Sequence, residues 1–180
     1  MATEIGFITH ELTEDNESGR ATGWLPGRLS DTGRANAARI GSRAVCQGIA
    51  AVFTSDLRRA EETVELAFPG REIPVLKDWR LRECDYGRLN GGPTSEVLAD
   101  REAYLEQPYP GGESWSTAVA RVGRFLDDLG LRWEGRRVLV VGHVATRWGL
   151  DHFLNGAALA DLTRSEFVWQ EGWEYRRAPL

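Results

Sequence analysis

Cysteine is scarce in this chain, and so are the signals that mark several special classes of protein. Cys46 and Cys84 are the only cysteines, and their spacing matches no metal motif, so neither a disulfide scaffold nor a cysteine metal site is expected. No run approaches about 18 apolar residues, the length of a membrane-spanning helix. The first residues also lack the basic and apolar regions of a signal peptide. These absences predict a cytoplasmic protein with no membrane partner.

Positive charge is not in excess either. The chain has 22 lysines and arginines against 27 aspartates and glutamates, a formal net charge of -5. A negative chain is not expected to bind nucleic acid. It can still bind a small anionic substrate, because a local cluster of arginines can outweigh the overall balance. The 180 residues, 42% of them hydrophobic, suffice for one domain and show no internal repeat.

Short apolar runs alternate with helical periodicity along the chain. The pattern predicts strands at 5–9, 49–54, 73–77 and 138–142. It predicts helices at 30–46, from about 56 to 69, from 114 or 116 to 130, and from 143 to about 155. Residues 166–170 and 173–176 resemble a closing hairpin. Alternating strands and helices predict an α/β fold, with three layers (α/β/α) and a mostly parallel central sheet. We expect a single domain over 1–180, with the irregular stretch 79–112 as a cap-like insertion over the site.

Two of the three histidines directly follow predicted strands. His10 comes after 5–9 and His143 after 138–142, and in a parallel sheet ligands bind beyond the carboxyl ends of the strands. Phosphoryl transfer through a covalent intermediate needs a neutral imidazole nucleophile, cations around the phosphoryl oxygens and an acid for the leaving oxygen. Arg59 and Glu83 are candidates for the last two roles. Taken one at a time, each residue type has an ordinary structural explanation.

Six segments, in order along the chain, resemble the motifs of the histidine phosphatase (phosphoglycerate-mutase-like) superfamily. ITHELTEDNESGRATGW is similar to the opening of that family, where a histidine follows the first strand, and its matching residues are His10, Asn16, Arg20, Thr22 and Gly23. RLSDTGRANAARIG resembles the turn and helix start that come next, and PGGES the segment before a late helix. TSDLRRAEET matches at Arg59, LRECDYG at Glu83 and Tyr86, and VLVVGH at His143.

The resemblance implies a phosphoglycerate-mutase-like fold and a phosphomonoesterase that acts on a small phosphorylated metabolite. His10 would form a phosphohistidine, and Arg59 with the imidazolium of His143 would hold the phosphoryl oxygens. Glu83 would protonate the leaving oxygen, and Tyr86 would form a wall of the pocket. Backbone N–H groups near Asp56 and Val144 would assist at the helix N-termini. No metal or other cofactor is implied.

The sequence departs from the family motif on both sides of the nucleophile. Thr9 and Glu11 stand where the family has arginine and glycine, and Val144 replaces a small residue. Loss of one donor to a transition-state oxyanion costs roughly 10²–10³ in rate, and a carboxylate beside the phosphate would repel it. Arg20 or Arg147 is a candidate to return the missing guanidinium to the site.

Three other functions fit parts of this pattern. GRATGW resembles the glycolytic mutases, although Arg101 is the only basic residue of 94–112, where those enzymes carry a basic pair. Thr9 and Glu11 favour a pseudophosphatase that binds a phospho-ligand without turnover. A metal hydrolase using His10, His143 and His152 has unsuitable spacing. The segment WQEGWEY is interpreted as structural, packed in the core or at the surface of a homodimer.

Overall fold

A single five-stranded sheet forms the centre of the protein. The computed structural model describes residues 1–70 and 72–179. The strands lie in the order β3-β2-β4-β1-β5, with bounds Thr3–Thr9 (β1), Ala51–Thr54 (β2), Val75–Lys77 (β3), Arg137–Gly142 (β4) and Trp173–Arg177 (β5). All neighbouring pairs are parallel except β1 and β5, which are antiparallel. The predicted, mostly parallel sheet is confirmed.

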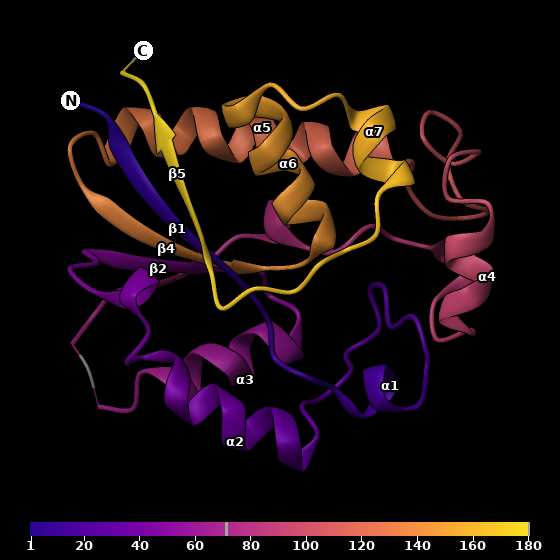
Figure 1. Cartoon of the computed structure of the whole chain (residues 1–180), viewed down its shortest axis with the longest axis horizontal. Coiled ribbons are helices and arrows are strands. Elements are labelled where there is room, and N and C mark those ends of the chain that lie inside the picture. The colour runs from indigo at the N-terminus through magenta and orange to yellow at the C-terminus, as the bar shows by residue number, and fades with distance from the viewer. Residues whose placement is uncertain (71, 180) are drawn as a thin grey trace.

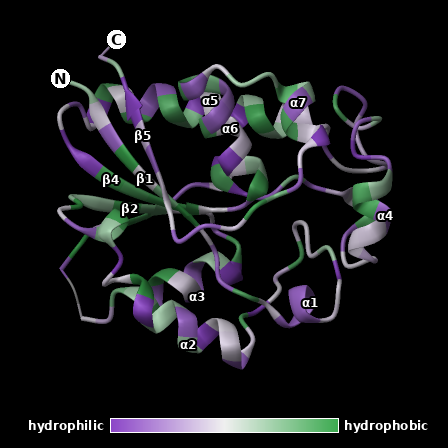
Figure 2. Cartoon of the chain, viewed as in Figure 1, coloured by the Kyte–Doolittle hydropathy of each residue, from purple (hydrophilic) through white to green (hydrophobic). Residues whose placement is uncertain are grey.

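Helices cover both faces of this sheet and complete the three predicted layers (Figure 1). One face carries α2 (Asp31–Ile40) and α3 (Arg58–Ala67), and the other carries α5 (Trp115–Arg132), α6 (Val144–Asn155) and α7 (Leu159–Arg164). Each face has its own buried apolar cluster, one built around Phe7, Val140 and Leu126 and the other around Ile8 and Val141. The central strands β2 and β4 are accordingly apolar along most of their length, whereas β5 is hydrophilic and the helices mix apolar and polar positions (Figure 2).

Local signals place the starts of the long helices correctly. The Ser30 hydroxyl accepts the Gly33 N–H at 3.1 Å and begins α2, and Ser114 caps α5 in the same way through Thr117. The ends differ from the prediction. The helix expected to reach residue 46 stops at Ile40, and a separate 3₁₀ turn follows at Ala44–Cys46. By contrast, α5 is longer than predicted and continues two residues beyond Gly130.

The predicted C-terminal hairpin is wrong. Trp173–Arg177 pairs with β1, and the segment 165–172 forms no strand. Trp173 and Tyr175 are buried against the apolar cluster of Phe7, so the second half of the expected hairpin finds its partner 166 residues or more away in the chain. Figure 1 shows 165–172 passing from α7 across the carboxyl end of the sheet before it enters β5.

Three short helices escaped sequence-based prediction, because a helix of one or two turns shows no readable periodicity. They are α1 (Glu14–Glu17), α4 (Thr94–Ala99) and α7. The irregular stretch 79–112 holds α4 and two 3₁₀ turns, Trp79–Leu81 and Gly87–Leu89. Tyr86 and Tyr109 from this stretch pack with Trp115 of α5 in a third apolar cluster. None of the helices in the described residues is long and apolar enough to cross a membrane.

Candidate active site

The register of two parallel strands places the two histidines side by side. Thr9 of β1 pairs with Gly142 of β4, so the next residues, His10 and His143, leave the sheet together. The His10 N–H donates to the Gly142 carbonyl at 3.0 Å, and the two imidazole centroids are 5.0 Å apart. The predicted convergence of these histidines at the carboxyl ends of their strands is therefore a property of the fold.

Arg59 lies between the two imidazoles. It belongs to the first turn of α3, which follows β2, and its side chain is buried. Its Nε is 3.2 Å from His10 Nε2, and one terminal nitrogen is 3.4 Å from His143 Nδ1. The guanidinium also donates to the Gly23 carbonyl at 2.8 Å and the Leu25 carbonyl at 3.2 Å, which fixes its plane.

These contacts define the tautomer of each histidine. A guanidinium has no acceptor, so the ring nitrogens that face Arg59 carry lone pairs. His10 therefore carries its lone pair on Nε2, where it accepts the Arg59 Nε–H, while its Nδ1–H donates to the Glu11 carbonyl at 2.7 Å. His143 accepts at Nδ1 and donates from Nε2 to the Ser55 hydroxyl at 2.7 Å. The atom of His10 that can act as a nucleophile is Nε2.

Burial keeps both imidazoles neutral. Desolvation and the nearby Arg59 charge lower the pKa of His10 to about 3. The same two causes hold the pKa of His143 well below its usual value. A neutral His10 satisfies the need for a nucleophilic lone pair. The environment of His143 does not favour the expected imidazolium, because burial and the Arg59 charge both oppose its protonation.

Glu83 is a buried carboxylate beside the start of α6. Its oxygens accept the N–H groups of Cys84 at 2.9 Å, Ala145 at 3.0 Å and Val144 at 3.3 Å. Desolvation outweighs these hydrogen bonds and raises the pKa of Glu83 above its ordinary value. A carboxyl with a raised pKa is suited to donate a proton near neutral pH.

The expected backbone donors at the start of α6 are occupied. The N–H groups of Val144 and Ala145 point to Glu83, which leaves the start of α6 without its predicted role toward phosphoryl oxygens. Asp56, at the other predicted helix start, forms a two-point ion pair with Arg82, with both N···O distances 2.6 Å. The N-terminus of α6 thus faces the Glu83 carboxylate rather than a phosphate.

Two clefts meet at these groups, and His10, Glu83 and Val144 line both of them. The first, here called the α4 cleft, has a volume of about 310 Å³ and is also lined by residues of the irregular stretch and of α4. The second, here called the aromatic cleft, has a volume of about 540 Å³. Six residues line the aromatic cleft and not the α4 cleft, namely Thr9, Glu11, Leu12, Asn36, His143 and Trp169.

Most of the other predicted binding residues line the α4 cleft. Arg20, Thr22, Gly23 and Tyr86 belong to its wall, and Asn16 lines both clefts. Gly23 has a positive φ of 54°, and a Cβ there would lie 1.7 Å from the Asn90 side chain, so the turn requires glycine. One Arg20 terminal nitrogen donates to the Gly91 carbonyl at 2.9 Å on the exposed rim.

The expectation for Arg147 is not met. Its guanidinium pairs with Asp151 at 2.9 Å, contacts the Tyr175 hydroxyl at 3.2 Å and lies over the Trp173 ring. It lines neither cleft. The position one turn into α6 faces β5 rather than the histidines, so Arg147 cannot replace the guanidinium that Thr9 lacks.

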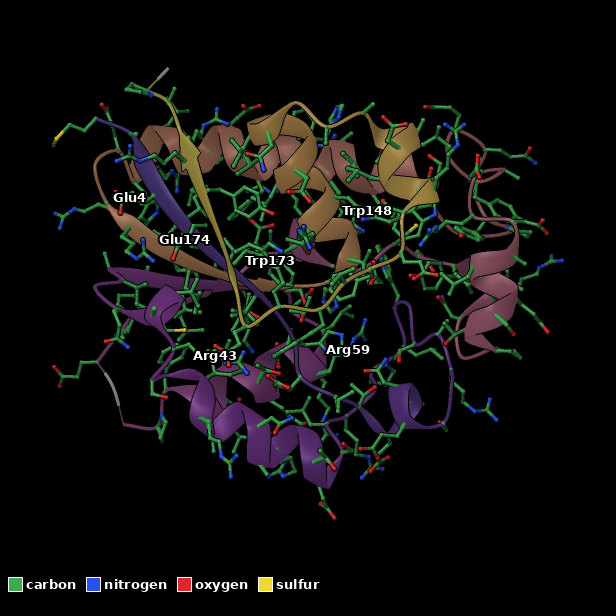
Figure 3. All side chains as sticks on the ribbon, viewed as in Figure 1. Glu4, Arg43, Arg59, Trp148, Trp173 and Glu174 are labelled. Carbon is green, nitrogen blue, oxygen red and sulfur yellow. The ribbon has the colours of Figure 1, made fainter. Side chains whose placement is uncertain are left out.

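Glu11 is not the repulsive neighbour that the sequence suggested. Its carboxylate is 5% exposed and pairs with Arg43 at 2.9 Å, while its backbone N–H donates to the Thr63 hydroxyl at 3.1 Å. The ion pair neutralises the charge of Glu11 beside His10. Arg43 and Arg59 both lie on the α2–α3 side of the segment that leads into β5 (Figure 3).

Sequence reasoning missed the residues that support Glu83. The Glu83 carbonyl accepts the Trp24 indole N–H at 2.6 Å and a terminal nitrogen of Arg121 at 2.7 Å. Arg121 lies between Ala118 and Phe125 on the apolar face of α5, and an arginine on such a face was a signal that could have been used. Ser55, which directly follows β2, orients His143 through its hydroxyl, a role that sequence reasoning did not assign.

Within residues 1–70 and 72–179, histidine, cysteine, aspartate and glutamate side chains form no cluster that could hold a metal ion. The groups that converge are a neutral imidazole whose lone pair faces a guanidinium, a second imidazole, that guanidinium and a carboxyl with a raised pKa.

Known proteins share both the sequence pattern and the fold. Residues 5–168 match the family model of the histidine phosphatase superfamily (branch 1). A 2,3-bisphosphoglycerate-dependent phosphoglycerate mutase 2 from Gloeobacter violaceus is 34% identical over 150 residues, which cover 76% of this chain and 68% of that protein. A mutase from Corynebacterium diphtheriae is 40% identical over 104 residues, 53% of this chain but only 42% of that protein. The chain thus matches less than half the length of some curated relatives.

Solved structures support the same relationship. Bacillus stearothermophilus YhfR aligns with a TM-score of 0.83 and 26% identity, over 96% of this chain and 90% of that one. The mycobacterial glucosyl-3-phosphoglycerate phosphatase Rv2419c aligns with a TM-score of 0.75 and 27% identity, over 91% and 84% of the two chains. The fold, the order of the motifs and the pair of histidines agree with this match. The chain belongs to the histidine phosphatase superfamily.

Proposed function

We propose that the protein is a phosphomonoesterase that hydrolyses a small phosphorylated metabolite through a phosphohistidine on His10. The observation that carries this proposal is the state of His10. Its Nε2 lone pair faces Arg59 at 3.2 Å, and its Nδ1 is held by a backbone carbonyl. A neutral, oriented imidazole beside a buried guanidinium is what in-line attack on phosphorus requires.

The reaction has two steps. His10 Nε2 bonds to phosphorus while the ester P–O bond breaks, and the proton of Glu83 passes to the leaving oxygen. Glu83 then takes a proton from water, which attacks the phosphohistidine and releases inorganic phosphate. Arg59 offsets the charge of the phosphoryl oxygens. A bound phosphoryl dianion would favour protonation of His143, which then adds a second cation.

The stretch 79–112 acts in this proposal as a cap on the α4 cleft. It contributes Tyr86 and Leu98 to the lining of that cleft. Glu83 belongs to the same stretch, so the acid and the cap are one continuous piece of chain.

A mutase is the alternative that the curated relatives suggest. A mutase must hold a bisphosphorylated intermediate and therefore needs free cations. Arg101 lines the α4 cleft, but its guanidinium donates to the carbonyls of Thr163 and Ser165 and lies over Trp148. This commitment of Arg101 favours transfer to water over transfer to a second hydroxyl.

A panel of phosphate monoesters tests the proposal. Wild type should release inorganic phosphate, and His10→Gln should reduce the rate by about 10³-fold or more. His152→Gln is the matched control, because His152 bonds to the Ala157 carbonyl and lines neither cleft. Quenching with labelled substrate should trap a phosphohistidine on the peptide that contains His10. Isomerised phosphoglycerate without phosphate release would establish the mutase, and no turnover of any monoester would establish a pseudophosphatase.

A further inference from the structure

The aromatic cleft is the larger of the two clefts, and the proposed chemistry uses only one end of it. His10, Glu83 and His143 line that end. The remainder includes three apolar side chains: Leu12 and Trp169, which line this cleft alone, and Phe167, which lines both clefts. All three are partly exposed, at 41%, 36% and 52%, so each has apolar surface that a bound molecule can cover.

The charge of this cleft differs from that of the α4 cleft. Among the described residues, the lining of the aromatic cleft contains no lysine or arginine, whereas Arg20, Arg59 and Arg101 line the α4 cleft. Its charged members are Glu11, which is paired with Arg43, and Glu83, which accepts three backbone N–H groups. A ligand with a second anionic group therefore finds no partner here, while an uncharged flat group finds apolar contact.

Arg43 holds the aromatic wall in place. One terminal nitrogen pairs with Glu11 at 2.9 Å, another donates to the Glu171 carbonyl at 3.3 Å, and the guanidinium lies 5.6 Å from the centre of the Trp169 ring. Glu11 follows the nucleophile directly in the chain. The ion pair therefore links the backbone at His10 to the segment 165–172, which carries the aromatic side chains.

We propose that the aromatic cleft binds the leaving group of the phosphomonoester, and that this group is uncharged and aromatic. The group packs against Phe167 and Trp169 while its phosphoryl oxygens face Arg59. Glu11 and Arg43 act as positioning residues for this wall. This assignment rests on the proposed phosphatase function and adds a substrate class to it.

The first test compares two substrates with similar alcohol leaving groups, benzyl phosphate and ethyl phosphate. Wild type should have a KM for benzyl phosphate that is at least about 10-fold lower than its KM for ethyl phosphate. The packing of one aromatic ring against others raises affinity by roughly tenfold. Trp169→Ala should remove most of that difference and leave kcat and the KM for ethyl phosphate within about twofold. Trp79→Ala is the matched control: Trp79 is 50% exposed, against 52% for Trp169, and it lines neither cleft.

Leu98 distinguishes the two clefts, because it lines the α4 cleft and not the aromatic one. A large rise in the KM for benzyl phosphate in Leu98→Ala, with none in Trp169→Ala, would place the leaving group under α4 and overturn the proposal. Equal KM values for benzyl and ethyl phosphate in wild type would overturn it as well.

A binding measurement separates this assignment from the proposed function. Benzylphosphonate and methylphosphonate cannot be hydrolysed, so calorimetry with them needs no turnover. Benzylphosphonate should bind about 10-fold more tightly to wild type, and Trp169→Ala should lose that advantage. If no monoester is hydrolysed but this difference persists, the phosphatase function fails and the aromatic subsite stands. If monoesters are hydrolysed but the two phosphonates bind equally, the subsite fails and the function stands.

Glu11→Gln tests the positioning role. It should weaken benzylphosphonate binding by about threefold to tenfold and leave methylphosphonate unaffected, because the wall moves while the phosphoryl site stays. Glu11→Asp, which keeps the charge, should recover part of the loss. Equal weakening of both ligands would show that Glu11 supports the phosphoryl site and not the aromatic wall.

Discussion

Burial, more than neighbouring charge, determines the protonation of the side chains at the carboxyl end of the sheet. His10 and His143 stay neutral because desolvation disfavours their imidazolium forms, and Glu83 holds its proton more tightly for the same reason. One environment thus produces both a neutral imidazole and a carboxyl that holds its proton, the two groups that the proposed mechanism uses. Burial lowers the pKa of a histidine, whose protonated form is charged, and raises the pKa of a glutamate, whose deprotonated form is charged.

Removal of the acid should affect substrates according to their leaving groups. Glu83→Gln keeps the size of the side chain but has no proton to transfer. We expect kcat for an alkyl phosphate to fall about 10²–10⁴-fold, the usual contribution of general acid catalysis. For p-nitrophenyl phosphate, the rate of the first step should fall much less, because p-nitrophenolate leaves without protonation. Equal losses for both substrates in single-turnover measurements would mean that Glu83 is not the acid.

Thr9 is the position where one substitution should increase activity. Thr9→Arg adds a bidentate phosphate donor next to His10, and we expect phosphate release to rise by on the order of 10²-fold. Glu11 should be kept, since its removal leaves Arg43 without its carboxylate. The double variant Thr9→Arg/Glu11→Gly is therefore expected to be less stable than Thr9→Arg in urea unfolding. A Thr9→Arg protein that folds normally and shows no gain would contradict a simple missing-donor explanation.

Among the secondary-structure elements, α5 holds the loop that carries Glu83, the proposed acid. Arg121 on this helix is 1% exposed and binds both carboxylate oxygens of Glu113, at 3.0 and 2.9 Å. It also donates to the carbonyls of Arg80, Arg82 and Glu83. A single buried guanidinium therefore fixes the path of residues 80–83 against the helix.

Arg121→Met should destabilise the protein by about 3–5 kcal/mol, because it leaves a partly buried carboxylate and several carbonyls without a donor. Urea unfolding measures this loss. Arg124→Met, an exposed position on the same helix, is the control and should change stability by less than about 0.5 kcal/mol. Glu113→Gln with Arg121→Met should recover part of the loss. A folded Arg121→Met protein should also have a lower kcat, since the Glu83 backbone is no longer held.

Buried strands and long helices were predictable, and helices of one or two turns were not. Buried parallel strands such as 138–142 are continuous apolar runs, and α5 shows a clear apolar face, so local sequence specifies both. The strand 173–177 was found, but its partner was not, because pairing with β1 depends on contacts across the whole chain. The six residues of α7 are too few to show a helical hydrophobic period.

Stability of the protein as a unit should depend on pH through its buried histidines. The pKa of His10 is about 3 in the folded protein, against 6.5 as its ordinary value. Between these values the unfolded chain binds a proton that the folded protein does not, so stability falls as the pH drops below 6.5. This group alone should lower the free energy of unfolding by about 2 kcal/mol between pH 7.5 and pH 5. His143 acts in the same direction, while the raised pKa of Glu83 acts in the opposite one.

His10→Asn isolates that contribution, because His143 and Glu83 remain in both proteins. Urea titrations at pH 7.5 and pH 5 should show a loss of stability for wild type that exceeds the loss for His10→Asn by about 2 kcal/mol. His152→Asn should follow wild type. Identical pH dependence of wild type and His10→Asn would mean that the His10 imidazole is not desolvated.

The expected cytoplasmic location and homodimer remain predictions.

The family, the layered fold and the convergence of His10, Arg59, Glu83 and His143 followed from local sequence, because apolar strands and short motifs are written in consecutive residues. Contacts between distant residues decided the rest. The carboxylate of Glu11 is neutralised by Arg43, 32 residues away, and Glu83 is held by Arg121, 38 residues away. Trp169 lines a cleft instead of packing in the core. No periodicity marks such pairs, since each partner alone is an ordinary charged or apolar residue, and only the packed fold brings them within hydrogen-bonding or van der Waals distance.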